Sequence, residues 1–427
     1  MNDKLSTMES NSRLITHNLS LKKGYKQTEL GVLPTDWEVK AIAEIANIKG
    51  GGTPSSFNSS FWNGDINWFT PTEIGKTKYV YESRRKITKD GYTTSSANLL
   101  PIGTVLLTSR AGIGDTAIIL NEACTNQGFQ SLIVSNEYDN EYVYYLVNTS
   151  TFQKLLLKHA SGSTFLEISP NKLKLIKIPL PPTLTEQTAI ATALSDMDRL
   201  IEGLEKLIAK KRNIKQGAMQ ELLTPYVMVN GELLMVNGKP KMKEGWEVKT
   251  LDKVIDCLDN LRVPLNEEER LKMKGDIPYC GANGVVDYVN DYLIDDNIIL
   301  IAEDGGYFDE YLTRPIAYQI NGKCWVNNHA HILKAKKDFV QEFVFYSLVH
   351  KNILMHLASG TRAKLNKGEL YKIKVNVPPK IKEQTRIAQI LSDMDTEITE
   401  LETQLSKYKM LKTGMMQELL TGKKRLI

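Results

Sequence analysis

Two stretches of the chain have apolar residues spaced alternately by four and three positions. One runs from Ile190 to Ile208 and the other from Ile387 to Tyr408. This spacing is typical of a helix that buries a narrow stripe against a second helix, as in a coiled coil. Paired prolines precede both stretches, at 181–182 and 378–379, and proline is tolerated only in the first turn of a helix. The pattern predicts two helices of about 40 residues, or roughly 60 Å each.

The two stretches are copies of one segment. Residues 181–224 and 378–421 align at a constant offset of 197, with 24 of 44 positions identical. The copying extends upstream, because Trp37-Glu38-Val39-Lys40 recurs as 246–249 and Ala160-Ser161-Gly162 recurs as 358–360. The sequences between these landmarks look unrelated. Each half of the chain is therefore a variable globular part followed by a constant helix.

A duplication of this kind predicts a pseudo-two-fold arrangement. A core helix inside each domain is the alternative, but such a long, narrow stripe buries more easily against a similar helix. The fold class we expect is α/β (α+β), with two similar globular domains separated by two long antiparallel coiled-coil helices.

The globular parts mix both kinds of secondary structure. Residues 104–108, 131–134 and 297–301 have the β-rich composition of strands. Residues 141–158 and 339–357 are apolar on one side and are expected to be helical. Glycine-rich turns separate these segments.

Composition excludes several classes of protein. The 427 residues are 42% hydrophobic and 24% charged, close to the average for globular proteins. No apolar run is long enough to span a membrane, and residues 1–23 lack the apolar core of a signal peptide, so we expect a cytoplasmic protein. The four scattered cysteines predict reduced thiols. A net charge of +4 is too small to indicate nucleic acid by itself.

The chain shows no familiar catalytic motif: it has no phosphate-binding loop, zinc-protease helix or nucleophile elbow. Cys324, His329 and His331 are close enough in sequence to suggest a metal site, but a fourth ligand is not evident. Polar residues hydrogen-bonded on a sheet are the favoured interpretation. We predict no catalytic residue, bound cofactor or metal in this chain.

Two long stretches without acidic residues favour a polyanion partner. They lie between Glu141 and Glu167 and between Glu342 and Glu369, at equivalent places in the repeat. Lysine and arginine there gain by releasing the counterions of phosphates, although a solvated helix face explains the same pattern. Together with a basic cluster at 84–86 and amides suited to base edges, they give a set of predicted DNA-binding residues. These are Arg84, Arg85, Lys86, Arg110, Lys154, Lys158, Ser161, Ser163, Asn327, Asn328, Arg362, Lys364 and Lys367.

Several short phrases resemble the DNA specificity (S) subunit of type I restriction-modification systems. They include Gly52-Thr53-Pro54-Ser55, Asn126-Gln127-Gly128-Phe129, Trp325-Val326-Asn327-Asn328-His329, and the paired prolines followed by Glu186-Gln187 or Glu383-Gln384. The resemblance covers roughly residues 24 to 425.

The resemblance implies that each globular part is a target recognition domain for half of a split DNA sequence. It implies partners: double-stranded DNA, two methyltransferase subunits that use S-adenosylmethionine, and two motor-nuclease subunits that use ATP and magnesium. The subunit itself would be non-catalytic. Residues predicted to bind partner subunits lie in the repeated helices: Glu186, Gln187, Asp196, Asp198, Glu383, Gln384, Asp393 and Asp395.

The predicted divisions follow from the repeat. We expect a flexible extension at 1–23, a first recognition domain at 24–180 and a first conserved helix at 181–224. A linker at 225–240, a second recognition domain at 241–377, a second helix at 378–421 and a tail at 422–427 complete the chain. The specificity module of a methylation-only system, a DNA-free coiled-coil scaffold and an enzyme with an unfamiliar site remain as alternatives.

Overall fold

The structure is a computed structural model that describes residues 23–110, 112–162, 166–358 and 363–426. The described chain divides into two compact units. The first contains the residues up to Gly203 together with those from Leu405 onward, and the second contains Leu204–Gln404. The predicted flexible extension at 1–23 lies, except for its last residue, outside the described residues.

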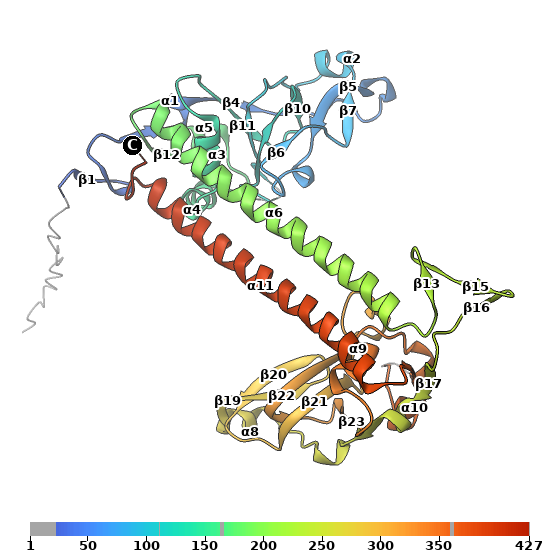
Figure 1. Cartoon of the computed structure of the whole chain (residues 1–427). Coiled ribbons are helices and arrows are strands. Elements are labelled where there is room, and N and C mark those ends of the chain that lie inside the picture. The colour runs from blue at the N-terminus through green and yellow to red at the C-terminus, as the bar shows by residue number, and fades with distance from the viewer. Residues whose placement is uncertain (1–22, 111, 163–165, 359–362, 427) are drawn as a thin grey trace, which may run out of the picture. The chain divides into compact units, whose positions relative to one another are not determined.

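Two long helices each contribute to both units (Figure 1). Helix α6 spans Leu184–Leu222 and helix α11 spans Ile381–Leu419, so their bounds differ by the same 197 residues as the sequence repeat. In the first unit, Ile190 and Leu194 of α6 share a core with the end of α11. In the second unit, the end of α6 packs against Ile387 and Leu391 of α11. The two helix segments therefore run antiparallel within each unit, as predicted.

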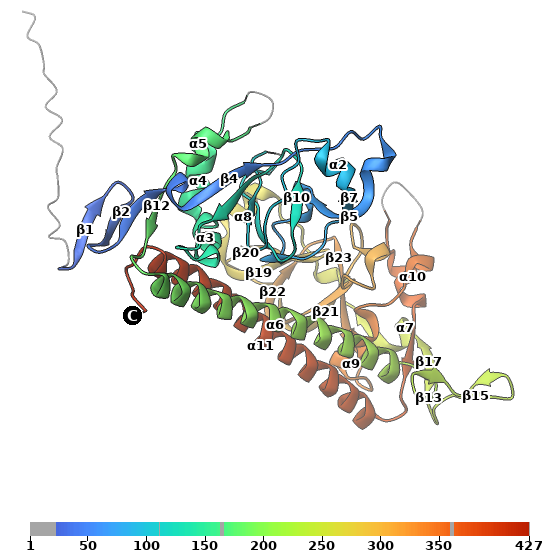
Figure 2. The same ribbon diagram turned by 90° about the horizontal axis from the view of Figure 1, so that it is seen from above.

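The first unit is built on a five-stranded and a three-stranded sheet with short helices beside them (Figures 1 and 2). The larger sheet has the order β4 (Ala46–Gly50), β11 (Gln130–Val134), β8 (Val105–Leu107), β9 (Thr116–Ile119) and β6 (Tyr79–Val80); the smaller has the order β10 (Ala123–Thr125), β5 (Trp62–Phe69) and β7 (Arg85–Ile87). The strand pairs are β1 (Tyr25–Thr28) with β2 (Gly31–Pro34), and β3 (Glu38–Ala41) with β12 (Lys177–Leu180). The helices are α1 (Ile42–Ile45), α2 (Lys89–Thr93), α3 (Asn140–Val147), α4 (Ser150–His159) and α5 (Pro170–Lys174), with 3-10 turns at Ser59–Phe61 and Pro71–Glu73.

The second unit is built on one six-stranded sheet. Its order is β18 (Ile255–Cys257), β23 (Ala330–Ala335), β21 (Ile294–Ala302), β22 (Ala317–Val326), β19 (Lys274–Gly281) and β20 (Gly284–Val289). The strand pairs are β17 (Glu247–Thr250) with β24 (Lys374–Val377), β13 (Met228–Val229) with β14 (Glu232–Leu233), and β15 (Met235–Val236) with β16 (Lys239–Pro240). The helices are α7 (Leu251–Val254), α8 (Glu267–Lys272), α9 (Gln341–Leu348) and α10 (Lys367–Lys372), with 3-10 turns at Asp259–Leu261, Phe308–Glu310 and Leu354–His356.

The two units share one topology although their interior sequences differ. Strand β22 pairs antiparallel with β21 from Ala317 to Cys324 and parallel with β19 at its last two residues, Trp325 and Val326. In the first unit these roles are divided between β9, which pairs antiparallel with β8, and β10, which pairs parallel with β5. A single six-stranded sheet in one unit therefore corresponds to two smaller sheets in the other.

Both predicted helices in the globular parts are shorter than expected. The stretch 141–158 forms α3 and α4 with a break at Asn148, whose side chain donates to the Tyr144 carbonyl and to Thr116. Thr149 then caps α4 by accepting the Phe152 N–H. In the second unit, α9 ends at Leu348 and only a 3-10 turn follows.

The stretch predicted as a linker contains two small hairpins. Each turns at an Asn-Gly pair, Asn230-Gly231 and Asn237-Gly238, with positive φ at both residues. Such pairs are the preferred residues of the tight turns that match strand twist. Periodicity over 225–240 is too short to reveal strands of two residues.

Candidate nucleic-acid interface

A polar turn follows strand β10 in the first unit. The Asn126 N–H donates to the Phe69 carbonyl at the end of β5 (3.0 Å), and the Asn126 side-chain oxygen accepts the Gly128 N–H (2.9 Å). The asparagine side chain thus closes the turn in place of a backbone carbonyl. Gln127 lies exposed at its tip, where its Oε1 accepts a hydrogen bond from the Thr53 hydroxyl.

The second unit has the same turn after β22. The Asn327 N–H donates to the Cys280 carbonyl (3.0 Å), and the Asn327 side-chain oxygen accepts the His329 N–H (2.8 Å). Asn328 is exposed at the tip. The two turns share only their first asparagine in sequence, yet each leaves a strand that pairs in parallel with its neighbour.

Equivalent backbone hydrogen bonds surround both turns. One hydrogen bond joins the turn to the residues that follow strand β8 in the first unit or β21 in the second. Another joins those residues to the segment that follows a Ser-Gly loop. They are Ser109 N–H to Gly128 O (2.7 Å) and Ile168 N–H to Ser109 O (3.1 Å) in the first unit, and Glu303 N–H to His329 O (2.8 Å) and Leu365 N–H to Glu303 O (2.7 Å) in the second. We call each set of three segments a turn cluster.

The side chains on this common backbone differ between the units. A short backbone β-bridge links the strand end to the segment after the loop. It pairs Arg110 with Glu167 in the first turn cluster and Asp304 with Lys364 in the second, so the basic and acidic residues exchange places. A shared backbone with different polar side chains suits two readers of different sequences.

Arg262 fixes the backbone of the second turn. Its guanidinium donates to the carbonyls of Asn328 (3.3 Å) and Ala330 (3.2 Å) and pairs with Asp259 (3.3 Å) and Glu303. Burial alone would raise the pKa of Glu303, but hydrogen bonds from Arg262 and from another cation hold it below its usual value. That second cation is Lys364, whose Nζ lies 3.0 Å from Oε1 of Glu303.

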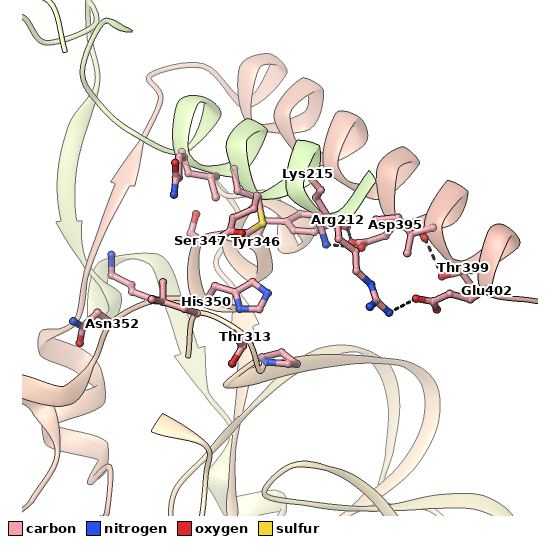
Figure 3. A pocket seen from close by; sticks show the side chains of 18 residues that line it. Arg212, Lys215, Thr313, Tyr346, Ser347, His350, Asn352, Asp395, Thr399 and Glu402 are labelled. Atoms are coloured by element: carbon pink, nitrogen blue, oxygen red, sulfur yellow. Dashed lines mark hydrogen bonds and ion pairs between the residues drawn. The ribbon is translucent and has the colours of Figure 1, made fainter. Parts of the chain in front are cut away.

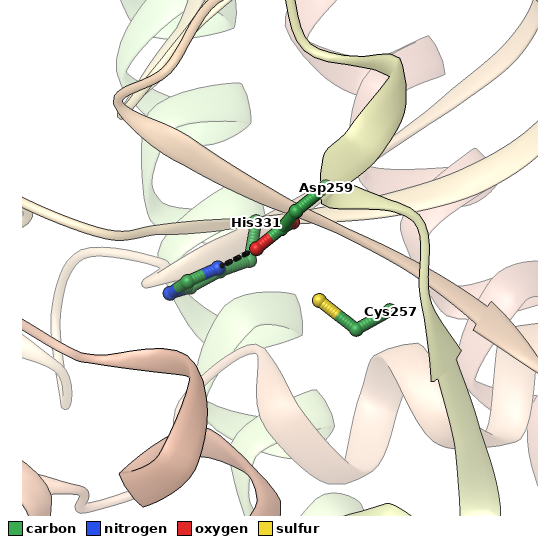
Figure 4. A group of neighbouring side chains, drawn as sticks. All are labelled: Cys257, Asp259 and His331. Atoms are coloured by element: carbon green, nitrogen blue, oxygen red, sulfur yellow. Dashed lines mark hydrogen bonds and ion pairs between the residues drawn. The ribbon is translucent and has the colours of Figure 1, made fainter.

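A buried histidine lies beneath this turn (Figure 4). The thiol of Cys257, a carboxylate oxygen of Asp259 and a ring nitrogen of His331 lie within 4.8 Å of one another. However, His331 Nδ1 contacts Asp259 (2.7 Å) and Nε2 contacts the Leu365 carbonyl (2.7 Å). Both ring nitrogens thus lie within hydrogen-bond distance of an oxygen, and a metal would have to displace one of these two contacts. Burial also raises the pKa of the Cys257 thiol to about 12, which disfavours the thiolate that a metal needs.

The three residues singled out from sequence as a possible metal site do not form such a group among the described residues. Cys324 lies in a buried apolar cluster. His329 contacts Asp304 through Nδ1 at 2.9 Å.

The predicted DNA-binding residues of the first unit lie on separate elements. Arg85 stacks on Trp62, with its guanidinium carbon 3.6 Å from the ring centroid. Strand β7, which carries Arg85 and Lys86, belongs to the same sheet as β10 and its turn. The other predicted DNA-binding residues of the first unit differ in exposure. Arg110 is half-buried in the turn cluster, and Ser163 lies outside the described residues. Exposed to solvent are Arg84, Lys154, Lys158 and Ser161.

In the second unit, only part of the predicted set faces solvent. Asn327 is 8% exposed, since its side chain closes the turn. Asn328, Lys364 and Lys367 are exposed, although Lys364 pairs with Glu303. Arg362 lies outside the described residues.

The predicted partner-binding residues make equivalent contacts in both units. Asp198 accepts from the Tyr145 hydroxyl (2.7 Å) and pairs with Lys412 (2.5 Å). Asp395 accepts from the Tyr346 hydroxyl (2.8 Å) and pairs with Lys215. Asp395 and Lys412 are the repeat equivalents of Asp198 and Lys215. In the first unit α6 supplies the aspartate and α11 the lysine, and in the second unit α11 supplies the aspartate and α6 the lysine.

The other members divide by exposure. Gln187 and Gln384 are buried, and their Oε1 atoms accept the N–H groups of Asp139 and Val340, both at 3.0 Å. The carboxylates Glu186 and Glu383 are held by Arg425 and by the Trp246 indole N–H respectively. Asp196 and Asp393 are exposed and, among the described residues, have polar contacts only within their own helix, to Arg199 and Gln389 respectively. Of the eight, these two are the most accessible.

A groove lies beside the helix pair in each unit. In the second unit a cavity of about 740 Å³ is bounded by α6, the end of α9 and α11 (Figure 3). In the first unit a cavity of about 540 Å³ lies at the equivalent place. Met219, Gln220 and Leu223 line one, and their repeat equivalents Met416, Gln417 and Leu420 line the other.

Sequence reasoning missed several residues that build the interface. Arg262, Asp259 and Thr53 were not selected, because their roles depend on partners that are far away in sequence. Asn126 and Gln127 were considered as amides that could read adenine edges, but they were not selected. An asparagine directly after a strand in both halves was the available signal for the turns.

No described helix has the combination of length and apolar character that crossing a membrane requires.

Comparison with known proteins identifies the class. The class is that of DNA specificity domains: residues 34–212 and 243–408 match the family described as type I restriction modification DNA specificity domain. The matches cover most of the chain, and the chain therefore belongs to this family.

Two of the relatives that the chain matches are specificity subunits of type I restriction enzymes. The type I restriction enzyme MjaIX specificity subunit of Methanocaldococcus jannaschii is 37% identical over 57% of this chain and 57% of its own length. The chain thus matches little more than half of that relative. The EcoprrI specificity subunit of Escherichia coli is 24% identical over 86% of this chain and 90% of its own.

A solved structure has the same fold. The S subunit of a type I restriction-modification system from M. genitalium has a TM-score of 0.60 and 18% identity, covering 90% of this chain and 96% of its own. The predicted fold class is confirmed.

Proposed function

We propose that this chain reads a two-part DNA target, one half-site per unit, and directs adenine methylation and restriction by partner subunits. The observation that carries the proposal is the turn cluster, which has one backbone arrangement in both units but different charged side chains around it. Its chemistry suits DNA: amides and cations on a fixed frame serve both base edges and phosphates.

The proposed DNA surface of each unit combines its turn cluster with the predicted cations of the same unit. In the first unit it adds the exposed Arg84, Arg85, Lys154 and Lys158 and the half-buried Lys86. In the second unit it adds Lys364 and Lys367. Ser163 and Arg362 belong to the proposed set by their place in the Ser-Gly loops. The non-catalytic role of the chain is also part of the proposal.

The repeated helices are proposed to bind two copies of one methyltransferase subunit. Grooves that share three identical repeat residues suit a partner that is present twice, because the same surface binds the same partner. Exposed Asp196 and Asp393 lie at equivalent positions and are the strongest of the predicted partner contacts. The methyltransferase subunits would use S-adenosylmethionine, and two motor-nuclease subunits would use ATP and magnesium.

A DNA-binding measurement separates this proposal from a DNA-free scaffold. The chain with its methyltransferase should bind duplex DNA with an affinity that falls steeply as salt rises, because phosphate contacts release counterions. A salt-independent or absent affinity would support the scaffold. Restriction assays with and without the motor subunit distinguish a methylation-only system.

Exchange of one unit tests the division of labour. If residues 42–176 are replaced by those of a relative with another target, only one half-site of the methylated sequence should change. The reciprocal exchange of 251–373 is the matched control and should change the other half-site. Altered recognition of both half-sites in either chimera would contradict the proposal.

A further inference from the structure

The tips of the two turns carry equivalent carboxamides. Gln127 and Asn328 each follow the asparagine that closes the turn, and both are exposed. The interiors around them differ in sequence, so an amide retained at this one place is best explained by something that the two half-sites have in common.

The free hydrogen-bonding groups at the tips include donors in both units. The Gln127 oxygen already accepts from Thr53, whereas its two N–H groups have no partner among the described residues. In the second unit, Arg262 holds the Asn328 main-chain carbonyl, and the Asn328 side chain has no partner in the described part of the chain. Because the backbone beneath each amide is fixed, little conformational freedom remains to be lost on binding.

We propose that Gln127 and Asn328 donate to a backbone phosphate at the same place in each half-site. This inference rests on the proposed function and deepens it. The two amides fix the register of each unit on the duplex, while neighbouring side chains choose the sequence. Phosphate positions are the same whatever the bases, and amide N–H groups are common phosphate donors.

Reading of adenine is the competing role for an amide. It uses the amide oxygen as acceptor from N6 and the N–H as donor to N7 at the same time. The Thr53 hydroxyl already uses one of the two lone pairs of the Gln127 oxygen and fixes where that oxygen lies, whereas a phosphate needs only the N–H groups and makes no demand on the oxygen of either amide.

The test uses the full chain in complex with its methyltransferase. Gln127→Leu and Asn328→Leu remove the amides, and Gln127→Glu keeps the size but adds a charge that repels phosphate. Asn47→Leu and Asn321→Leu remove exposed amides elsewhere in the same units and serve as matched controls. Affinity for target DNA, the methylated sequence and the melting temperature are measured for each variant.

We expect each leucine variant to bind target DNA roughly tenfold more weakly, the loss typical of one hydrogen bond to a charged group. Gln127→Glu should lose more, and the methylated sequence should stay unchanged. Replacement of one phosphate per half-site by neutral methylphosphonate should make wild type and the leucine variant bind equally.

Two results would overturn the inference: affinity within twofold of wild type, or a changed base in the methylated half-site, which would make the amides base readers. If the wild-type complex does not prefer its target to other DNA, the proposed function itself fails. That outcome is visible before any variant is compared.

Discussion

Arg425 holds the first unit together from the end of the chain. Its guanidinium pairs with Glu186, whose side chain is fully buried, and with both oxygens of Asp36 at 3.0 Å. These two carboxylates raise the pKa of Arg425, and Arg425 lowers that of Asp36. The arginine therefore compensates a charge that burial would otherwise disfavour.

Arg425→Ala should destabilise the first unit by about 3 kcal/mol, the lower end of the cost of removing one partner from a buried pair, because Arg425 keeps some solvent contact. At about 2–4 °C per kcal/mol, the melting temperature should fall by roughly 6–12 °C. Lys424→Ala removes a neighbouring exposed cation and is the control. Equal melting of the two variants would show that Glu186 does not need its partner.

The second unit should lose stability in acid. The pKa values of Asp259 and Glu303 are lowered: burial opposes ionisation, but His331 in one case and Arg262 in the other outweigh it. A depressed carboxylate pKa stabilises the fold above the unfolded value of about 4, and this contribution is lost as pH falls through the lower, folded value.

Melting temperature measured from pH 6 to pH 3 checks this prediction. The second unit should melt progressively earlier below about pH 4. Asp259→Asn should flatten that dependence, since one of the two titrating groups is removed. If the wild type and the variant show the same slope, Asp259 contributes nothing to the acid dependence.

At the scale of elements, the aspartates of the helix repeat have unequal roles. Asp395 receives a hydrogen bond from Tyr346 and an ion pair from Lys215, whereas Asp393 contacts only its own helix. Asp395→Ala should therefore cost about 1–2 kcal/mol, since Asp395 is partly exposed, while Asp393→Ala should cost little. Thermal unfolding of the two variants measures the difference, and a larger loss for Asp393→Ala would reverse the assignment.

The helices were predictable because their signal is local. Apolar spacing and the 197-residue offset predicted both helices to within three residues at each start and two at each end. The turn clusters were not predictable to the same degree. Their hydrogen bonds join Asn327 to Cys280 and Arg262 to Asn328, pairs that are 47 and 66 residues apart, and no periodicity reports such contacts. The stretch 141–158 is helical as predicted, but the break between α3 and α4 was not foreseen; it arises because side chains at Asn148 and Thr149 compete for the backbone.

At the scale of the whole molecule, the helix pair is proposed to set the distance between half-sites. Four residues inserted after Gly203 and four after Gln404 leave the contacts inside each unit intact, because these positions are the boundaries between units. Each insertion lengthens its helix by about 6 Å. The unread gap should grow by about two base pairs at 3.4 Å per pair. Methylation mapping reports the gap, and an unchanged gap would exclude this role for the helices.

The central claim is that this chain confers the choice of a two-part DNA sequence. Single-molecule mapping of adenine methylation tests it most directly, in cells that express the methyltransferase subunit with this chain and in cells that express the methyltransferase alone. We predict a new motif of two half-sites with a fixed unread gap, present only when this chain is expressed. Identical methylation in the two strains would contradict the claim.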